Sequence, residues 1–184
     1  MTIREVDLSL CRMVPAAVIR SGVQRVFINR LNRAREHVRY VVVISPWITI
    51  SAKRSCPFLS LVQVIQTRRM PAYFITRRPE SDQQTRAIDM LKSCPTVELV
   101  YNENVHAKIY ACTGPQPHGF ALLGSANLTA NSLALYEIGL LIIGVGPGSS
   151  IVEDLANFGL RHLRTRPESE VVKKIDVRSL RNVF

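Results

Sequence analysis

The chain has few cysteines, few acidic residues and no long apolar run. Its 4 cysteines are scattered without a Cys-x-x-Cys pair, which argues against a zinc site or a disulfide framework. No apolar run approaches the roughly eighteen residues that a membrane-spanning helix needs. Arg4, Glu5, Asp7 and Arg12 interrupt the beginning of the chain, so a secretory signal pattern is missing. These absences favour an intracellular protein, and we expect a cytoplasmic location.

The shortage of acidic residues leaves a strong positive charge. Asp and Glu number 14 against 24 Lys and Arg, a formal net charge of +10. Such an excess favours a polyanionic partner, either nucleic acid or an anionic membrane surface. The apolar content of 47% supports a folded domain, and without internal repeats or a low-complexity linker we expect one domain over residues 1–184. Residues 1–19 are expected to form a short helix or an arm, and residues 168–184 a dimer arm or a basic appendage.

Strand and helix patterns alternate through the first half of the chain. Residues 38–45 (VRYVVVIS) form an almost continuous β-branched run, which is typical of a strand buried on both faces. Helical spacing appears over 23–34, from Pro57 onward and over 82–92, and further strands are predicted at 72–76 and 97–100. After residue 105 the predicted strands are consecutive, and Ser150 with Glu153 predicts a capping box for a last helix. The fold class is therefore α/β, a mixed, partly parallel β-sheet with helices on both faces.

Residues 105–137 hold the side chains with the most specific chemistry. His106 and Lys108 are two residues apart, so they project from one face if the strand that follows includes them. Ser125 and Asn127 end a second predicted strand, and Glu137 precedes a third. If these strands are neighbours, an imidazole able to act as a nucleophile meets three donors suited to a pentacovalent phosphate. No cluster of Asp or Glu lies close by in the sequence, so neither a metal site nor a cofactor is expected.

His-Ala-Lys at residues 106–108, followed by Gly-Ser-Ala-Asn at 124–127, resembles the signature of the phospholipase D superfamily. The position of Glu137 before an apolar strand is similar too. The resemblance implies a phospholipase D-like domain and a metal-independent phosphodiesterase that forms a covalent phosphohistidine. In this chemistry one histidine attacks and a second protonates the leaving group. Because this chain has a single motif, the resemblance also implies one active site shared across the two-fold axis of a homodimer.

The resemblance assigns the catalytic roles to five residues: His106, Lys108, Ser125, Asn127 and Glu137. One position departs from the family pattern, because Thr113 stands where the family usually has a supporting Asp. This difference leaves open a member of the family that binds nucleic acid without cutting it.

Five further residues are predicted to hold the substrate around the mouth of the cleft: Trp47, Lys53, Arg54, Arg77 and Arg78. The arginines and the lysine follow predicted strands or lie in a basic loop, where they could contact phosphates. Trp47 follows the strand at 38–45, where it could line the cleft or stack on a base, and a packing role is an equal alternative.

Three functions follow from these patterns. The first is a nuclease that cleaves DNA or RNA, because the motif indicates cleavage of a phosphodiester and the net positive charge indicates a polyanionic substrate. The second is a phospholipase acting on anionic phospholipid, which ranks lower because no helix pattern shows a strongly apolar membrane-binding face. The third is the non-cleaving nucleic-acid-binding protein, as part of a larger defence or repair complex.

Overall fold

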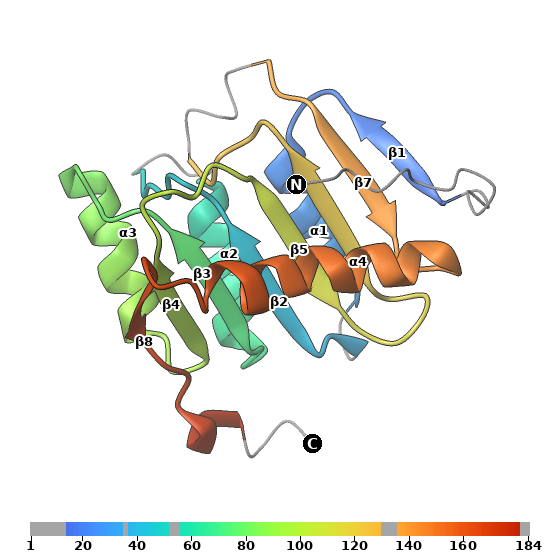
Figure 1. Cartoon of the computed structure of the whole chain (residues 1–184). Coiled ribbons are helices and arrows are strands. Elements are labelled where there is room, and N and C mark those ends of the chain that lie inside the picture. Colours follow the sequence, from blue (N-terminus) through green and yellow to red (C-terminus); the bar gives the residue numbers. More distant parts are fainter. Residues whose placement is uncertain (1–13, 35–36, 52–55, 130–135, 181–184) are drawn as a thin grey trace.

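The computed structural model describes residues 14–34, 37–51, 56–129 and 136–180. Its centre is an eight-stranded sheet with the order β1-β7-β6-β5-β2-β3-β4-β8 (Figure 1). The strands are β1 Ala16–Ile19, β2 Tyr40–Ile44, β3 Ala72–Thr76, β4 Val97–Tyr101, β5 Ile109–Thr113, β6 Phe120–Gly124, β7 Gly139–Ile143 and β8 Glu170–Lys173. β2, β3 and β4 pair in parallel and the other pairs are antiparallel. The predicted mixed, partly parallel sheet is confirmed.

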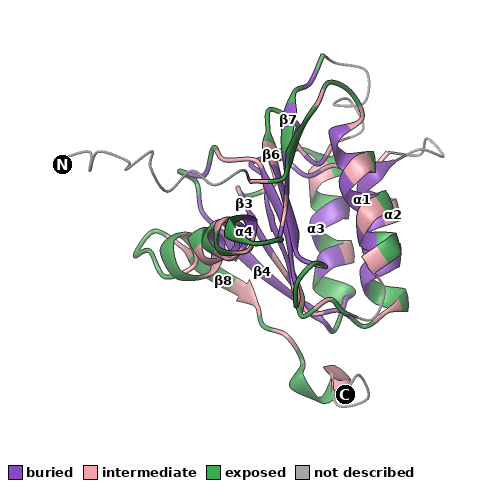
Figure 2. Ribbon diagram, turned by 90° about the vertical axis from the view of Figure 1, so that its right-hand side faces the viewer, coloured by how far each residue is buried: buried purple, intermediate pink, exposed green. Residues whose placement is uncertain are grey.

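Helices cover both faces of the sheet, as predicted. Three lie on one face: α1 Val23–Ala34, α2 Pro57–Thr67 and α3 Asp82–Ser93 (Figure 2). On the other face lie α4 Pro147–Asn157 and the π-helical segment η4 Phe158–Leu163 that continues it, and a short 3₁₀ helix, η5 Val177–Leu180, follows β8. None of the helices in the described ranges has the length and apolar content needed to cross a bilayer.

β2 explains why an almost continuous apolar run stands at residues 41–44. The strand lies between β5 and β3, and all four of these side chains are fully buried. Val41 and Val43 pack into the core below α1, α2 and α3, whereas Val42 and Ile44 pack into the core below α4. Because successive side chains point to opposite faces, a strand covered on both faces needs an apolar residue at every position.

One predicted helix start is confirmed and another is wrong. α2 begins at Pro57 as expected. The capping box at Ser150 and Glu153 is wrong, because α4 already begins at Pro147. Gly146, with a φ of 53°, ends the preceding connection, and Pro147 suits the first helical turn because its ring fixes φ and it has no N–H to satisfy. The Ser150 hydroxyl therefore lies inside the helix and donates to the Pro147 carbonyl at 2.9 Å.

The two ends of the described chain add the edge strands. β1 pairs with β7, and β8 pairs with β4. Residues 14–19 therefore contain a strand instead of the expected helix or arm, and residues 1–13 lie outside the described ranges. Lys173 on β8 donates to the carbonyls of Cys94 and Val97 beyond the end of α3. Residues 170–173 are thus part of the sheet.

The α4 layer comes close to the centre of the sheet at Gly159. A Cβ atom at this position would lie 2.8 Å from Val42 Cγ1 and 3.2 Å from Ile44 Cδ1, both on fully buried side chains of β2. Those side chains are held between two layers and have little room to move. The η4 segment therefore depends on a residue without a side chain at its contact with the sheet.

We expect Gly159→Val to lower the free energy of unfolding by about 1–3 kcal/mol, because overpacking displaces the side chains of β2. Urea denaturation measures this change. Arg161→Val is the matched control, since Arg161 is an exposed residue of the same segment. Equal stability of the two variants would contradict the close contact at Gly159.

Candidate active site

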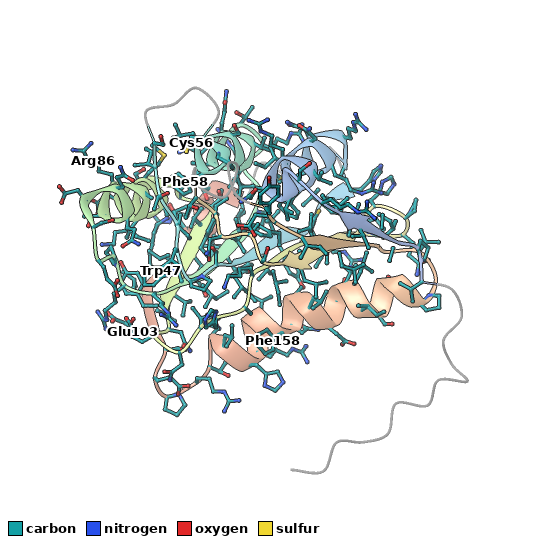
Figure 3. All side chains as sticks on the ribbon, turned by 90° about the horizontal axis from the view of Figure 1, so that it is seen from above. Trp47, Cys56, Phe58, Arg86, Glu103 and Phe158 are labelled. Atoms are coloured by element: carbon teal, nitrogen blue, oxygen red, sulfur yellow. The ribbon has the colours of Figure 1, made fainter. Side chains whose placement is uncertain are left out.

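One edge of the sheet collects the ends of five strands. The register pairs Ile44 of β2 with Ile75 of β3 and with Ile109 of β5. Ile109 in turn pairs with Leu123 of β6. The carboxyl ends of β2, β3 and β6 therefore meet the amino ends of β5 and β7 along this edge, which we call the site edge. It is the upper edge in Figure 1, and Figure 3 views the side chains from above it.

All five residues of the motif lie at the site edge. His106 and Lys108 come just before β5, Ser125 and Asn127 just after β6, and Glu137 just before β7. The expectation that His106 and Lys108 belong to the strand itself is wrong in detail. β5 begins at Ile109, whose partner on β2 is Ile44, the last residue of that strand. Beyond this pair β2 offers no further residue for ladder hydrogen bonds, so residues 105–108 form a connection that leads into β5.

Backbone hydrogen bonds join the two halves of the motif. The Gly124 N–H donates to the Lys108 carbonyl at 3.1 Å, and the Ser125 N–H donates to the Ile138 carbonyl at 3.0 Å. The Ser125 hydroxyl donates to Glu137 Oε2 and accepts from the Ile138 N–H at 3.1 Å. Glu137 is 9% exposed, so its carboxylate is shielded from water beside this hydroxyl. In this arrangement Ser125 supports Glu137, and its hydroxyl proton is already in use.

His106 and Lys108 contact each other directly. Lys108 Nζ lies 3.0 Å from His106 Nδ1 and 2.9 Å from the His106 carbonyl oxygen. An ammonium group only donates hydrogen bonds, so Nδ1 accepts here and a neutral ring carries its proton on Nε2. His106 is exposed and Lys108 is half-buried, so both remain open to a ligand. A bound anion would offer Lys108 a charged acceptor in place of the imidazole.

Buried side chains from distant elements hold the loop that carries Ser125 and Asn127. The Tyr110 hydroxyl donates to the Ala126 carbonyl at 2.8 Å, and the Gln24 amide donates to the Asn127 carbonyl at 2.6 Å. The Leu128 N–H donates to Ser45 Oγ at 3.0 Å. Burial raises the pKa of the Tyr110 phenol far above its usual range, so this hydroxyl keeps its proton. Each of residues 126–128 therefore has a backbone group that is held by a hydrogen bond to a buried side chain.

The sequence reasoning missed Gln24, Ser45 and Tyr110 as supports of the site. For two of them, the sequence pattern contains a sign that the side chain needs a hydrogen-bond partner. Gln24 lies on the buried side of α1 beside Val23, where an amide needs a partner. Tyr110 lies in a buried strand, and a buried tyrosine hydroxyl usually finds an acceptor. Ser45 left no signal beyond its place at the end of a buried strand.

Two buried polar atoms at the site lack a hydrogen bond to any described residue. They are Gln24 Oε1 and Asn127 Oδ1. An unsatisfied buried acceptor costs about 1–3 kcal/mol, so each such atom in a folded protein needs a reason. Both atoms belong to the pair that joins α1 to the motif loop. The contact between α1 and the motif loop is therefore polar on both sides.

The structure separates the residues that were predicted to bind the substrate. Arg77 lies at the site edge, where its Nε donates to the Val105 carbonyl at 3.1 Å and its guanidinium stands 5.2 Å from the half-buried Trp47 ring. Arg78 instead pairs with Glu103 at 3.3 Å and with Glu170 at 2.5 Å, so two carboxylates balance its charge. Trp47 and Glu103 are labelled in Figure 3. Lys53 and Arg54 lie outside the described residues.

Thr113 lies at the opposite end of β5, about 13 Å along the strand from Ile109 at about 3.3 Å per residue. It is fully buried, and its hydroxyl donates to the Tyr40 carbonyl of β2 at 3.2 Å. The residue that replaces the usual Asp therefore contacts the sheet and none of the motif residues.

The surroundings of the site edge favour an anion. α1, α2 and α3 all begin next to it, so the positive ends of three helix dipoles point toward it. Within the described part of the chain, no group of three or more His, Cys, Asp or Glu side chains is placed to hold a metal ion.

Three cysteines, Cys56, Cys94 and Cys112, are buried and form no disulfide with one another. Burial raises the pKa of the Cys112 thiol to about 12.

Comparison with known proteins gives a fold. No family model matches the chain, and no curated protein does. Among solved structures, Nuc from Salmonella typhimurium, a phospholipase D family member, has a TM-score of 0.61 at 15% identity over 86% of this chain and 98% of its own. NucT from Helicobacter pylori has 0.54 at 16% identity, covering 76% and 94%. Phosphatidylserine synthase from Haemophilus influenzae has 0.54 at 12% identity, covering 86% and 39%. The chain therefore has a phospholipase D-like fold.

We expect Tyr110→Phe to lower the free energy of unfolding by about 1–3 kcal/mol, because the buried Ala126 carbonyl loses its donor. Hydrogen exchange should also become faster at the amides of residues 125–128. The control is Tyr73→Phe in β3, because the Tyr73 hydroxyl makes no hydrogen bond with the described residues. Faster exchange in both variants, or in neither, would remove Tyr110 as a support of the motif loop.

Proposed function

From this fold and this edge, we propose that the protein is a metal-independent phosphodiesterase that cleaves nucleic acid. Its active site is shared by the two subunits of a homodimer. The observation that carries the proposal is the meeting of both motif halves at one sheet edge, joined by the Gly124–Lys108 hydrogen bond. The catalytic residues would be His106, Lys108, Ser125, Asn127 and Glu137.

The proposed reaction has two steps. A neutral His106 attacks phosphorus, and the bond to the leaving oxygen breaks as this oxygen takes a proton from His106 of the partner subunit. Water then attacks the phosphohistidine and releases the phosphate monoester, with its proton returning to the second imidazole. Lys108, released from His106 Nδ1 by the incoming phosphate, and the Asn127 amide would stabilise the charge that develops on the phosphate oxygens. Glu137, held by Ser125, would orient an imidazole.

The charge distribution supports nucleic acid as the substrate. The chain carries a net charge of +10. Arg77 lies next to the site, because its side chain donates a hydrogen bond to the carbonyl of Val105, the residue before His106. Arg77 forms no ion pair with a described residue, so its charge is available to a phosphate. The half-buried Trp47 ring lies against this guanidinium and would hold it at the site edge.

An apolar surface next to the site supports the homodimer. Val18, Ile138 and Leu140 are 58%, 59% and 38% exposed, and they border a cavity of about 260 Å³ above Gly124 and Gly139. The N–H of Ile138 also donates to the Ser125 hydroxyl, so this surface adjoins the motif. A second copy bound here in two-fold symmetry would cover exposed apolar side chains and bring its own motif toward the first.

We expect hydrolysis of oligonucleotides to persist in excess EDTA, because an imidazole nucleophile needs no metal-bound hydroxide. His106→Ala should abolish it while leaving the unfolding temperature unchanged, and Asn127→Ala should lower the rate about 10²–10³-fold through loss of one donor. Chromatography of single- and double-stranded DNA and RNA products measures the activity.

His118→Ala is the control, because His118 lies in the loop between β5 and β6, away from the site edge. Hydrolysis that stops in EDTA and returns with Mg²⁺ would disprove the phosphohistidine route. Hydrolysis of anionic phospholipid vesicles, with oligonucleotides left intact, would assign the alternative substrate class.

We expect Val18→Glu to convert an active dimer into an inactive monomer, because a carboxylate would have to be buried at the apolar surface. Sedimentation and activity measured on the same samples test this expectation. Val177→Glu is the matched control, since Val177 is 66% exposed on η5 and lies outside the proposed interface. A fully active monomer would rule out the shared active site.

A further inference from the structure

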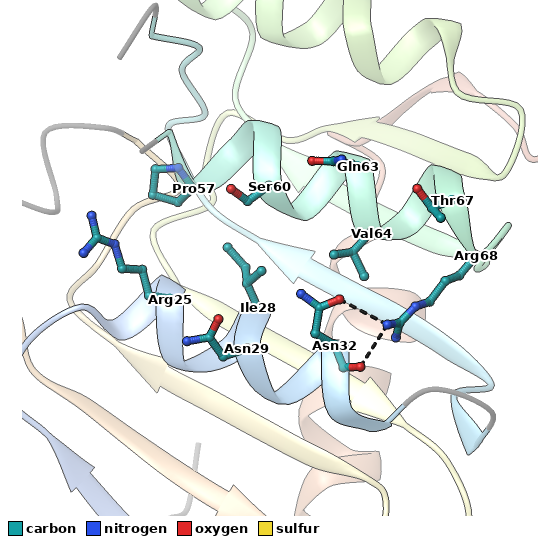
Figure 4. A pocket seen from close by; sticks show the side chains of 10 residues that line it. All are labelled: Arg25, Ile28, Asn29, Asn32, Pro57, Ser60, Gln63, Val64, Thr67 and Arg68. Carbon is teal, nitrogen blue, oxygen red and sulfur yellow. Dashed lines mark hydrogen bonds between the residues drawn. The ribbon is translucent and has the colours of Figure 1, made fainter. Parts of the chain in front are cut away.

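A polar groove of about 540 Å³ runs between α1 and α2, on the face of the sheet opposite α4 (Figure 4). Ile28 and Val64 form part of its floor and are almost fully buried. Amide and hydroxyl side chains line its walls, and an arginine stands at each end: Arg25, Asn29, Asn32, Ser60, Gln63 and Arg68. Neutral donors of this kind, together with arginine, are the groups that contact phosphates in nucleic-acid complexes.

Among the residues that the structure describes, no carboxylate balances the positive charge of the groove. α1 and α2 contain neither Asp nor Glu, and none of the ion pairs between described residues involves a side chain of the groove. Arg68 is held by neutral acceptors, the carbonyls of Leu31 at 2.9 Å and Asn32 at 2.8 Å, so it is fixed in place without a carboxylate partner among the described residues. In contrast, the charge of Arg78, at the other side of the site edge, is balanced by two glutamates.

The groove opens at the site edge. Gln24, the residue before Arg25, donates to the Asn127 carbonyl, so the Arg25 end of α1 lies beside the motif loop. α2 begins beside the same loop, because Cys56 Sγ contacts the Thr49 carbonyl at 3.8 Å and the Thr49 N–H donates to the Leu128 carbonyl at 3.1 Å. From Arg25 the groove follows α1 to Asn32 and Arg68 (Figure 4), a distance of about 10 Å at about 1.5 Å per residue.

We infer that this groove binds the sugar–phosphate backbone of a nucleic-acid strand where the strand leaves the active site. The inference rests on the proposed function and adds a path for the substrate. In a duplex each strand carries one phosphate per about 3.4 Å of helix axis, and successive phosphates lie farther apart than this rise, so a groove of about 10 Å reaches two of them. Positive charges at both ends suit an extended polyanion, whereas a small anion would need them together. Arg25 makes the phosphate contact nearest the scissile bond, and the amides and hydroxyls contact the backbone beyond it.

The test compares Arg25→Gln with Arg161→Gln. Each variant removes one exposed arginine, but Arg161 lies on η4, on the opposite face of the sheet. Binding is measured by fluorescence anisotropy over a range of salt concentrations, in a His106→Ala background that leaves the strand uncut. For a long single-stranded oligonucleotide, Arg25→Gln should reduce the slope of log K against log salt by about 0.7 and weaken binding about fivefold at about 0.1 M salt. Arg161→Gln should leave both unchanged.

In the protein with His106 intact, Arg25→Gln should slow cleavage of the long strand at low concentration, and Arg161→Gln should leave it unchanged. Equal binding by the Arg25→Gln, Arg161→Gln and unaltered chains, with cleavage intact, would overturn the groove and leave the proposed nuclease standing. Binding that depends on Arg25 in a chain that cleaves no phosphodiester would support the groove and overturn the nuclease. If the unaltered chain binds no strand, both proposals fail.

Discussion

The antiparallel pairing of β5 with β6 is the contact on which the whole candidate site depends. It sets Ile109 opposite Leu123, and one residue further the Gly124 N–H reaches the Lys108 carbonyl. A slip of one residue would turn every side chain of one strand to the other face of the sheet. Gly124 is required at this point, because a Cβ atom there would lie 2.2 Å from the Ile138 carbonyl oxygen. The close approach of the backbone before β7 thus brings Glu137 to Ser125.

Around this pairing, the site is supported by rigid elements. Tyr110 comes from β5, Ser45 from the end of β2 and Gln24 from α1, and each contacts the backbone of the motif loop. A loop held this way keeps its side chains in place before a ligand arrives, which lowers the entropy lost on binding. The cost is polar burial, including two acceptors without a partner among the described residues.

The pairing of charges divides the basic surface into structural and available parts. Arg78 and Arg164 each contact carboxylates, Glu103 and Glu170 for the first and Glu98 for the second. Arg25 and Arg77 form no ion pair with the described residues, and both lie close to the site edge. A net charge alone indicates a polyanionic partner without showing where it binds. The positions of the few acidic residues supply that information, because they mark the arginines whose charge is already balanced.

The sequence by itself determined the fold class, the candidate residues and most of the elements, but not the edge strands β1 and β8. The β-branched run of β2, the helical spacing of α1 and the order of the two motif halves are local patterns, and the structure places both halves at one edge. The catalytic roles of His106, Lys108, Ser125, Asn127 and Glu137 stay predictions. The tertiary structure alone decided the start of α4, the edge strand β8, the support from Gln24 and Ser45, and the groove between α1 and α2. Each of these depends on which groups meet across the fold: Gln24 and Asn127 are 103 residues apart in the sequence, and only folding brings an amide and a carbonyl so separated within hydrogen-bonding distance.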